Sequence, residues 1–427
     1  MTLSAYNLIG VGTNQKFYVS NGGAYYDITP LRQTSTLTNP FSTVLDSAAV
    51  IVTDAAGGYI NNDYVTFNGS TAIGGITLLG EYQLTVQSPT TYLIQAESPA
   101  SLILSTGIFT AQFKLANGVK VVLSTTRSLP NGFVAGTTYY VVNTSGFNFQ
   151  LAATSGGTAI SPTGTQSGIH TATAKATSTT ASGGGTVYAM YQINIGPEYT
   201  LPLTGWGAGP WGGGAWGIGQ SVTDSLRLWS QSNFGEDLVY GPRGGAIYYW
   251  NASYGTSPSS FTITIASPGV LTLGFTPVNG DAVVLETTGA LPTGLVPGTV
   301  YYIVNASGLT CNLAATSGGS AINTSGTQSG TQYISIRGIK ASQLTGNSDV
   351  PTVQNYIFVS DTSRFVFAFG CNDYASTVQD PMLIRWSDQE SVVDWTPSAT
   401  NQAGSLRLSH GSKIITCLQT RQEIVVF

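Results

Sequence analysis

Charged side chains are scarce in this sequence of 427 residues: they make up 8% of it, and the formal net charge is −5 at pH 7. The 15 lysines and arginines form no cluster, which argues against binding nucleic acid through its phosphates, because such binding needs many basic contacts. The sequence also has no apolar run near the roughly 20 residues of a membrane span, and its start lacks the basic flank and apolar core of a secretory signal. We therefore expect no membrane span, and synthesis in a cytoplasm without export.

Histidine and cysteine are nearly absent as well. His170 and His410 lie far apart without a serine or cysteine nucleophile motif near either, so we interpret both as ordinary surface or packed residues. Cys311, Cys371 and Cys417 are odd in number and lack the spacing of a metal site, which predicts free, buried thiols. The sequence therefore predicts no catalytic residue, no metal and no cofactor.

Small and polar residues, above all glycine, serine, threonine and asparagine, are abundant in the sequence. The chain has 52 glycines and is 42% apolar, and it shows almost no helical periodicity. These residues favour strands and turns over helices, and the length allows several domains with cores of their own. The prediction is an all-β protein of several domains.

One segment occurs twice. Residues Asn117–Gly168 align without a gap to Asn279–Gly330, with roughly two thirds of the positions identical. In each copy a Leu-Pro-x-Gly turn separates two apolar strands, because proline fixes φ and glycine tolerates a tight turn. Phe149 alternates with its neighbours as in a half-buried strand, and Cys311 takes its place in the second copy. Each copy is predicted to be a small β-sandwich or barrel.

A weaker third copy precedes these two. The stretch Gly80–Ala96 again has a strand, a polar turn and a strand, and it follows a strand that ends in Asn-Gly. A polar run at Thr177–Gly185 then leads into the alternating "TVYAMYQINI". We interpret the first clear repeat as an insertion into this module, because loop tips tolerate insertions.

The remaining segments share a pattern of strand, short turn, strand and aromatic residue. They start near Leu8, Ser232 and Ser363, and a fourth begins at Gly411. Such hairpins build the blades of a propeller, in which radial stacking covers the faces that one hairpin cannot bury. The predicted fold is an all-β, propeller-like platform of antiparallel blades with inserted small β-sandwich or barrel modules; a stack of sandwiches is the alternative.

The predicted domains follow from these patterns, with their boundaries as listed here. They are the first part of the platform (1–37), the first part of the β-module (38–98), the inserted repeat copy 1 (99–176), the return of the module (177–197), the platform with a Trp/Gly-rich loop (198–260), the inserted repeat copy 2 (261–340) and the continuing platform blades (341–427).

Three stretches resemble a known family. They are "LTGWGAGPWGGGAWGIG" from Leu203, "IRWSDQESVVDWTPSATNQAGSLRLS" from Ile384 and the module "TTGALPTGLVPGTVYYIVNASG". Together they resemble tail proteins of short-tailed bacteriophages, of the nozzle or tail tubular protein B type. The resemblance covers the expected propeller and its inserts.

The resemblance implies a structural protein of the virion tail that is made in the host bacterial cytoplasm and has no enzymatic activity. It implies a ring, usually of six copies, below the tail adaptor protein, with tail fibres or spikes as further partners. DNA would leave through the ring without specific binding, which suits an acidic chain. The alternative is a host-receptor-binding tailspike or fibre-like protein that binds or degrades polysaccharide.

Trp206, Trp211 and Trp216 recur every five residues, a spacing that suits neither a helix face nor one face of a strand. We interpret them as anchors of an interface loop on a neighbouring subunit, and sugar stacking is the competing interpretation. The surrounding glycines lack the Lys-Ser/Thr and the helix of a phosphate-binding loop.

Five acidic residues crowd one stretch: Asp373, Asp380, Asp388, Glu390 and Asp394. Paired carboxylates serve glycosidases, but spacing along a chain does not reveal their separation in space. The stretch also lacks the glycine of the aspartate turns of sialidase propellers. We expect these residues at turn starts, accepting hydrogen bonds from main-chain amides.

The last residues, Glu423–Phe427, are mostly apolar, so we expect a strand buried in a sheet. It either pairs near Gln15–Ser20 to close a propeller or continues into blades beyond Phe427. The family resemblance favours a longer chain.

Overall fold

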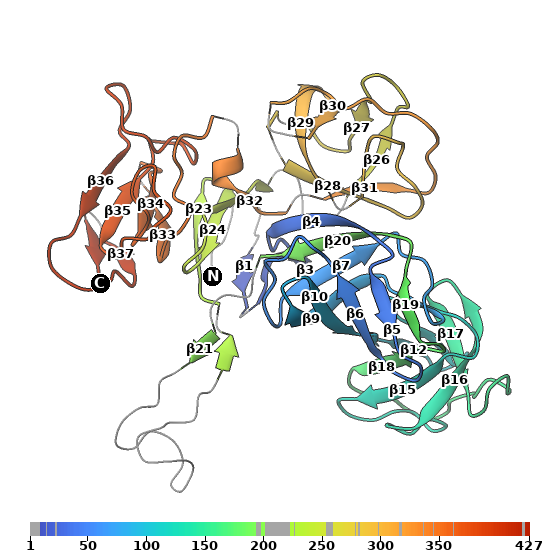
Figure 1. Ribbon diagram of the computed structural model, residues 1–427. Helices are drawn as coiled ribbons and strands as arrows, with labels where there is room; N and C mark the ends of the chain where they lie inside the picture. Colours follow the sequence, from blue (N-terminus) through green and yellow to red (C-terminus); the bar gives the residue numbers. More distant parts are fainter. Residues whose placement is uncertain are drawn as a thin grey trace, which may run out of the picture. The chain divides into compact units, whose positions relative to one another are not determined.

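The computed structural model describes residues 9–13, 15–21, 24–193, 198–200, 223–225, 227–252, 259–277, 279–280, 282–297, 299–315, 318–335, 337–344, 346–361, 363–420 and 423–427. Over these residues the protein is all-β, as expected, from β1 (Ile9–Gly12) to β38 (Ile424–Val426) (Figure 1). The described strand ladders are antiparallel, and a short 3₁₀ turn, η2 (Ala341–Gln343), precedes β33. The described residues contain no helix long and apolar enough to cross a membrane.

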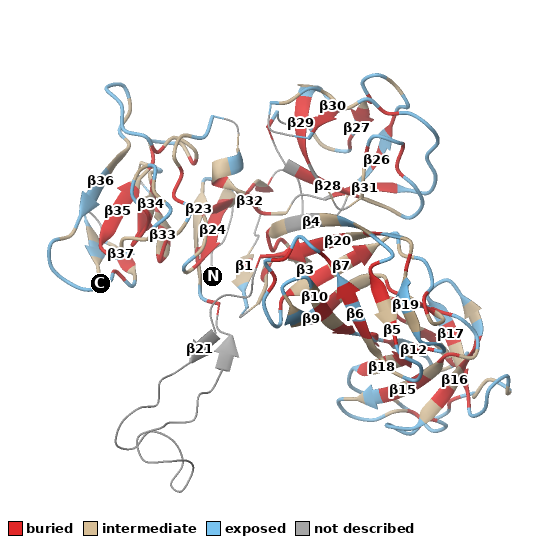
Figure 2. Ribbon diagram, in the orientation of Figure 1, coloured by how far each residue is buried: buried red, intermediate tan, exposed pale blue. Residues whose placement is uncertain are grey.

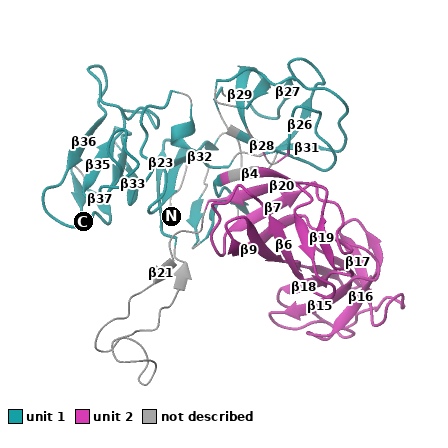
Figure 3. Ribbon diagram, viewed as in Figure 1, with its two compact units in different colours: residues 1–31, 195–296, 300–427 teal, residues 32–194, 297–299 magenta. Residues whose placement is uncertain are grey.

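The chain divides into two compact units (Figure 3). Unit 1 comprises residues 1–31, 195–296 and 300–427, and unit 2 comprises residues 32–194 and 297–299. Unit 2 therefore interrupts unit 1 in the sequence.

Unit 2 begins with an eight-stranded sheet in the order β19-β5-β6-β10-β9-β7-β20-β4. The predicted hairpin at 80–96 is confirmed as two of these strands. The strands are β4 (Leu31–Thr38), β5 (Phe41–Thr43), β6 (Ala49–Thr53), β7 (Tyr64–Asn68), β9 (Gly80–Ser88), β10 (Thr91–Gln95), β19 (Thr180–Gly183) and β20 (Thr186–Gln192). Two of them, β19 and β20, come after the first copy of the repeat yet pair with β5 and β7 from before it.

The first copy of the repeat forms a seven-stranded sheet in the order β11-β18-β15-β16-β17-β13-β12. The predicted pairing of strands across the Pro130 turn is confirmed in β15 and β16. The strands are β11 (Glu97–Pro99), β12 (Ser101–Ile103), β13 (Ile108–Thr110), β15 (Lys120–Thr125), β16 (Thr138–Ser145), β17 (Asn148–Ala152) and β18 (His170–Lys175). Since Ala100 alone separates β11 from β12, the two ends of this sheet belong to one bent segment.

The second copy forms a closed barrel in the order β26-β27-β30-β29-β28-β31. Here one strand, β26, pairs with both β31 and β27, where the first copy uses β11 and β12. The strands are β26 (Ser259–Ile263), β27 (Leu271–Thr272), β28 (Ala282–Thr287), β29 (Val300–Ser307), β30 (Thr310–Ala314) and β31 (Gln332–Ser335). Asn143 and Asn305 even share a φ of 52°, so the copies agree in backbone detail.

The two copies differ in how their cores end. Phe109 and Phe113 of the first copy lie in one apolar cluster with Val65 and Leu84 of the eight-stranded sheet. A short ladder, β14 (Lys114–Leu115) with β8 (Ile76–Thr77), joins the two sheets. The second copy instead has an apolar cluster made of its own residues, with Cys311 at the place of Phe149.

The rest of unit 1 consists of small antiparallel sheets. The first sheet is β1, β2 (Phe17–Asn21) and β3 (Ala24–Asp27), and a two-stranded ladder pairs β21 (Glu198–Thr200) with β22 (Thr223–Ser225). The second sheet is β23 (Trp229–Phe234), β24 (Asp237–Pro242), β25 (Tyr248–Trp250) and β32 (Ile339–Lys340). The third is β33 (Tyr356–Val359), β34 (Val366–Phe369), β35 (Leu383–Trp386) and β36 (Gly404–Arg407), and the fourth pairs β37 (Cys417–Gln419) with β38.

These four sheets pack on one another in chain order. Phe17 of the first sheet stacks on Tyr240 of the second, with ring centroids 4.5 Å apart. The Ile357 amide of the third sheet donates to Ser230 Oγ of the second at 3.0 Å. The other face of the third sheet packs through Phe369 on Cys417 of the fourth. Buried positions therefore run along both faces of the third sheet (Figure 2), as in a layer within a stack.

The end of the described chain differs from expectation. The strand β38 pairs with β37 and not with residues 15–20, which pair with β1 and β3. Ile424 and Val426 face the third sheet, but Val425 and Phe427 are 38% and 62% exposed. The prediction that the last residues are buried is therefore wrong. Ile424 and Val426 are only partly buried, because a two-stranded sheet packed on one face leaves the other exposed.

Candidate functional site

The Trp/Gly-rich loop was the interface candidate from the sequence. Trp206, Trp211 and Trp216 lie outside the described residues. Among the described residues, the acidic stretch and the buried polar side chains are the groups that could carry chemistry.

Three of the five acidic residues accept hydrogen bonds from main-chain amides, as predicted. Asp373 Oδ1 accepts from the Tyr374 amide at 2.8 Å, Asp380 Oδ1 from the Met382 amide at 2.9 Å, and Asp388 Oδ1 from the Gln402 amide at 2.8 Å. The hydrogen bond from the Met382 amide and the ion pair with Arg407 hold the pKa of the Asp380 carboxyl below its ordinary range. Each of these carboxylates is committed to shaping a loop.

Asp394 and Glu390 complete the acidic stretch. Asp394 accepts from Ser348 Oγ at 2.7 Å and from Asn401 Nδ2 at 3.1 Å, which joins two loops. Glu390 is exposed in a turn with a φ of 55°. The contacts of Asp394 serve the structure of these loops. Paired catalytic carboxylates are the competing interpretation of the acidic stretch.

A buried arginine, Arg385 on β35, binds two loops beside the third sheet. Its side chain is fully buried, and its guanidinium lies 4.0 Å from the centre of the Tyr374 ring. Nη1 donates to the Asn372 carbonyl at 3.1 Å, and Nη2 donates to the Asp349 carbonyl at 2.6 Å. Arg385 thus fastens the segments before β33 and after β34. A charged residue inside the apolar "LIRW" strand was the sequence signal for it.

The histidines are packed or exposed as expected. His170 is 5% exposed, with Nδ1 2.9 Å from Thr125 Oγ1 and Nε2 3.1 Å from Gln166 Oε1. His410 is exposed beside Ser409. Burial lowers the pKa of His170 below its ordinary value of 6.5.

Protonation of His170 should cost stability at mildly acidic pH. The folded state resists the proton that the unfolded state accepts near pH 6.5, so the free energy of unfolding should fall as pH drops below that value. The second copy has Gln332 at this position, so His170→Gln should remove the part of the pH dependence of unfolding that is due to His170. Urea unfolding of both proteins at pH 7.5, 6.0 and 5.0 measures it. An equal loss in both would exclude His170 as the cause.

The three cysteines are free and buried, as predicted. Burial raises the pKa of Cys311 to about 11 and the pKa of Cys371 and of Cys417 to about 12. A nucleophilic cysteine needs the opposite shift, since the thiolate is the reactive form. These thiols therefore serve as small apolar side chains.

A buried polar network in unit 2 went unpredicted. Tyr92 and Tyr191 share a hydrogen bond of 2.8 Å between their hydroxyls, and the Tyr191 hydroxyl donates to Asp54 Oδ2 at 2.6 Å. The Arg32 guanidinium lies 5.5 Å from the centre of the Tyr191 ring and donates to the Gly57 carbonyl. Burial raises the pKa of both tyrosines and lowers that of Arg32. The network closes the loop after β6 over the eight-stranded sheet.

The sequence held only a partial signal for this network. Asp54 and Asp63 bracket a Gly-Gly, Asn-Asn loop, which marks a turn with carboxylates. The tyrosine partner of Asp54, Tyr191, lies at a sequence separation of 137 residues. Only the tertiary fold brings the two together.

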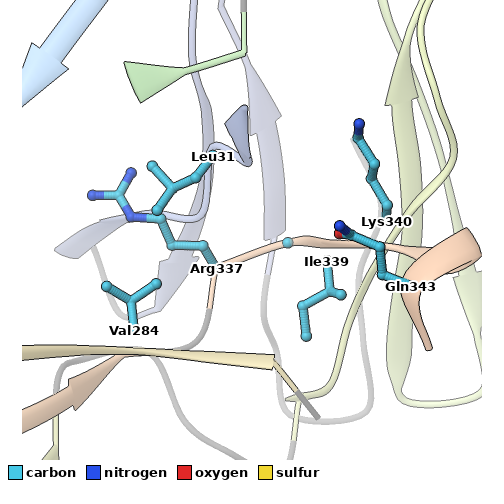
Figure 4. A pocket seen from close by; sticks show the side chains of 7 residues that line it. Leu31, Val284, Arg337, Ile339, Lys340 and Gln343 are labelled. Atoms are coloured by element: carbon cyan, nitrogen blue, oxygen red, sulfur yellow. The ribbon is translucent and has the colours of Figure 1, made fainter. Parts of the chain in front are cut away.

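A small cavity of about 30 Å³ lies beside the segment that leaves the barrel (Figure 4). Leu31, Val284 and Ile339 line it together with Arg337, whose Nη1 lies 3.6 Å from Asp27 Oδ2. That volume suits a water molecule or two and no substrate. Across the described part of the chain, no group of three His, Cys, Asp or Glu side chains is arranged to hold a metal ion.

Comparison with known proteins gives no match, either to a family model or to a curated protein.

Proposed function

We propose that the chain is a structural component of a bacteriophage tail: a nozzle or tube ring below the adaptor that forms a conduit for DNA ejection. In this proposal it has no enzymatic activity, and its small sheets are blades of a propeller-like platform. Copies associate in a ring of six and contact the tail adaptor protein and the tail fibres or spikes.

The packing of the small sheets in unit 1 carries this proposal. Sheets that follow one another in the chain lie face to face, through Phe17 on Tyr240, then Ile357 on Ser230, then Phe369 on Cys417. Radial stacking of antiparallel blades has this order of contacts. Asp373, Asp380 and Asp388, which accept main-chain hydrogen bonds, and the buried thiols fit a structural role, because their contacts belong to the fold.

The inserts fit the same proposal. In the second copy Ser259 pairs with Ile334, and in the first copy Glu97 pairs with Thr173, so each copy enters and leaves at neighbouring strands. The second copy, which has its own apolar cluster, is the kind of module that extends a platform without rebuilding it. The formal net charge of −5 suits a conduit, because a wall that attracted phosphates would retard the DNA.

Electron microscopy of the purified protein tests the proposal. We expect class averages with six-fold symmetry and an open axial channel. Elongated trimers would contradict a conduit and would favour the alternative, a host-receptor-binding tailspike or fibre-like protein. Mass photometry of the same sample checks the copy number independently.

A further inference from the structure

The barrel of the second copy carries an open groove of about 580 Å³ along the outer side of β26. One wall consists of β27 and Gly274, and the other is the segment Gln328–Gln332. Figure 2 shows exposed loops around this part of the barrel. A groove of this volume lies in the usual range of ligand sites.

The lining is neutral and rich in hydrogen-bonding groups. Thr262, Thr272, Gln328 and Thr331 are exposed along it, and no residue described as lining it carries a charge. Its apolar members, Phe261, Ile263 and Leu273, are 5%, 5% and 3% exposed, so they belong to the barrel core. A ligand here meets hydroxyls and amides, each able to donate and accept.

In the first copy, a side chain crosses the position that corresponds to the edge of this groove. Phe109 pairs with Phe149 and Leu271 with Cys311, which sets Gly274 at the position of Gln112. The Gln112 amide group donates to the Glu97 carbonyl at 3.3 Å and to the Glu81 carbonyl at 2.8 Å. Glycine at position 274 removes the side chain that spans the edge of the groove.

One further difference makes the outer surface of the second copy more polar. Thr331 stands where the first copy has Ile169, which is 62% exposed.

We propose that this groove binds a neutral oligosaccharide. Hydroxyl groups match a lining that both donates and accepts, whereas a charged ligand would find no counter-charge there. A peptide would lack the apolar pocket in which a side-chain anchor packs, because the apolar lining residues are buried in the core. The site goes beyond the proposed conduit and does not depend on it.

Affinity electrophoresis of the full chain in native gels tests the site. The gels contain dextran, an α-mannan or a galactan, with polygalacturonate as the charged comparison. At least one neutral polysaccharide should retard the wild-type protein. Gly274→Gln should weaken the apparent binding about tenfold, because its side chain fills the groove edge as in the first copy. Thr331→Ile should weaken it as well.

Leu309→Gln is the matched control, since it adds a glutamine to an exposed turn of the same barrel and should leave retardation unchanged. A Cβ at position 274 would meet only Ser259 Oγ, at 3.7 Å, so the variant should fold, and circular dichroism checks this. The proposal is wrong if no neutral polysaccharide retards the wild type, if Gly274→Gln is retarded equally, or if polygalacturonate retards it as strongly. A ring without retardation would leave the conduit intact and remove the site.

Discussion

Arg385→Ala should lower the free energy of unfolding of the described fold by about 3–5 kcal/mol, the range for breaking a buried charged contact. The wild-type guanidinium is fully buried, lies over the Tyr374 ring and donates to two main-chain carbonyls. Alanine leaves both carbonyls without their donors and a void beneath the ring. Chemical denaturation followed by circular dichroism measures the loss.

The matched control is Arg407→Ala on the neighbouring strand β36. Arg407 Nε lies 2.6 Å from Asp380 Oδ2, but its side chain is 63% exposed, so its loss should cost about 1 kcal/mol or less. Arg385→Met keeps the length of the stem and should cost less than alanine. A loss below about 1 kcal/mol for Arg385→Ala would contradict the role assigned to its hydrogen bonds.

Deleting the two copies of the repeat should have opposite results. Residues 259–335 form a barrel with its own apolar cluster, and Ser259 lies opposite Ile334. A short Gly/Ser linker in their place should shift the unfolding temperature of the remaining protein by roughly 4 °C or less. The deletion stops before Ile339, because Ile339 pairs with Tyr249 of the second sheet.

Deleting residues 97–175 should instead abolish cooperative unfolding of unit 2. That deletion removes Phe109, Phe113 and Leu123 from a cluster that also contains Val65 and Leu84, so the eight-stranded sheet would expose its apolar face. Differential scanning calorimetry with limited proteolysis distinguishes the two deletions. A cooperative transition for residues 32–194 without the first copy would show that the shared core is dispensable.

Local patterns in the sequence were enough for the strands and turns. Pro130 and the glycine after it predicted the hairpin of β15 and β16, and alternation predicted Cys311 in a core position. Turn chemistry predicted the amide bonds of Asp373 and Asp380. These features depend on neighbours within a few residues, which the sequence displays directly.

The fused core of unit 2 and the groove could not be predicted in this way. Val65 and Phe109 meet because two sheets pack together, and no local pattern specifies that packing. The groove depends on one glycine, Gly274, whose meaning emerges only when Gln112 is seen spanning the same edge in the first copy. The alignment of the two copies contains the exchange of Gln112 for Gly274, but only the structure shows its effect on the groove.

The return of β19 and β20 to the eight-stranded sheet sets an order for synthesis. The Ser182 hydroxyl donates to the Asn39 carbonyl across 143 residues. During synthesis β5 therefore lacks its partner β19 for roughly 10 s at typical translation rates. The first copy, whose end strands pair with each other, can fold within that interval and bring the two halves of the sheet together. A newly made chain therefore holds an unfinished, apolar sheet edge until the inserted module has folded, and slow translation or early release would leave that edge open to other chains.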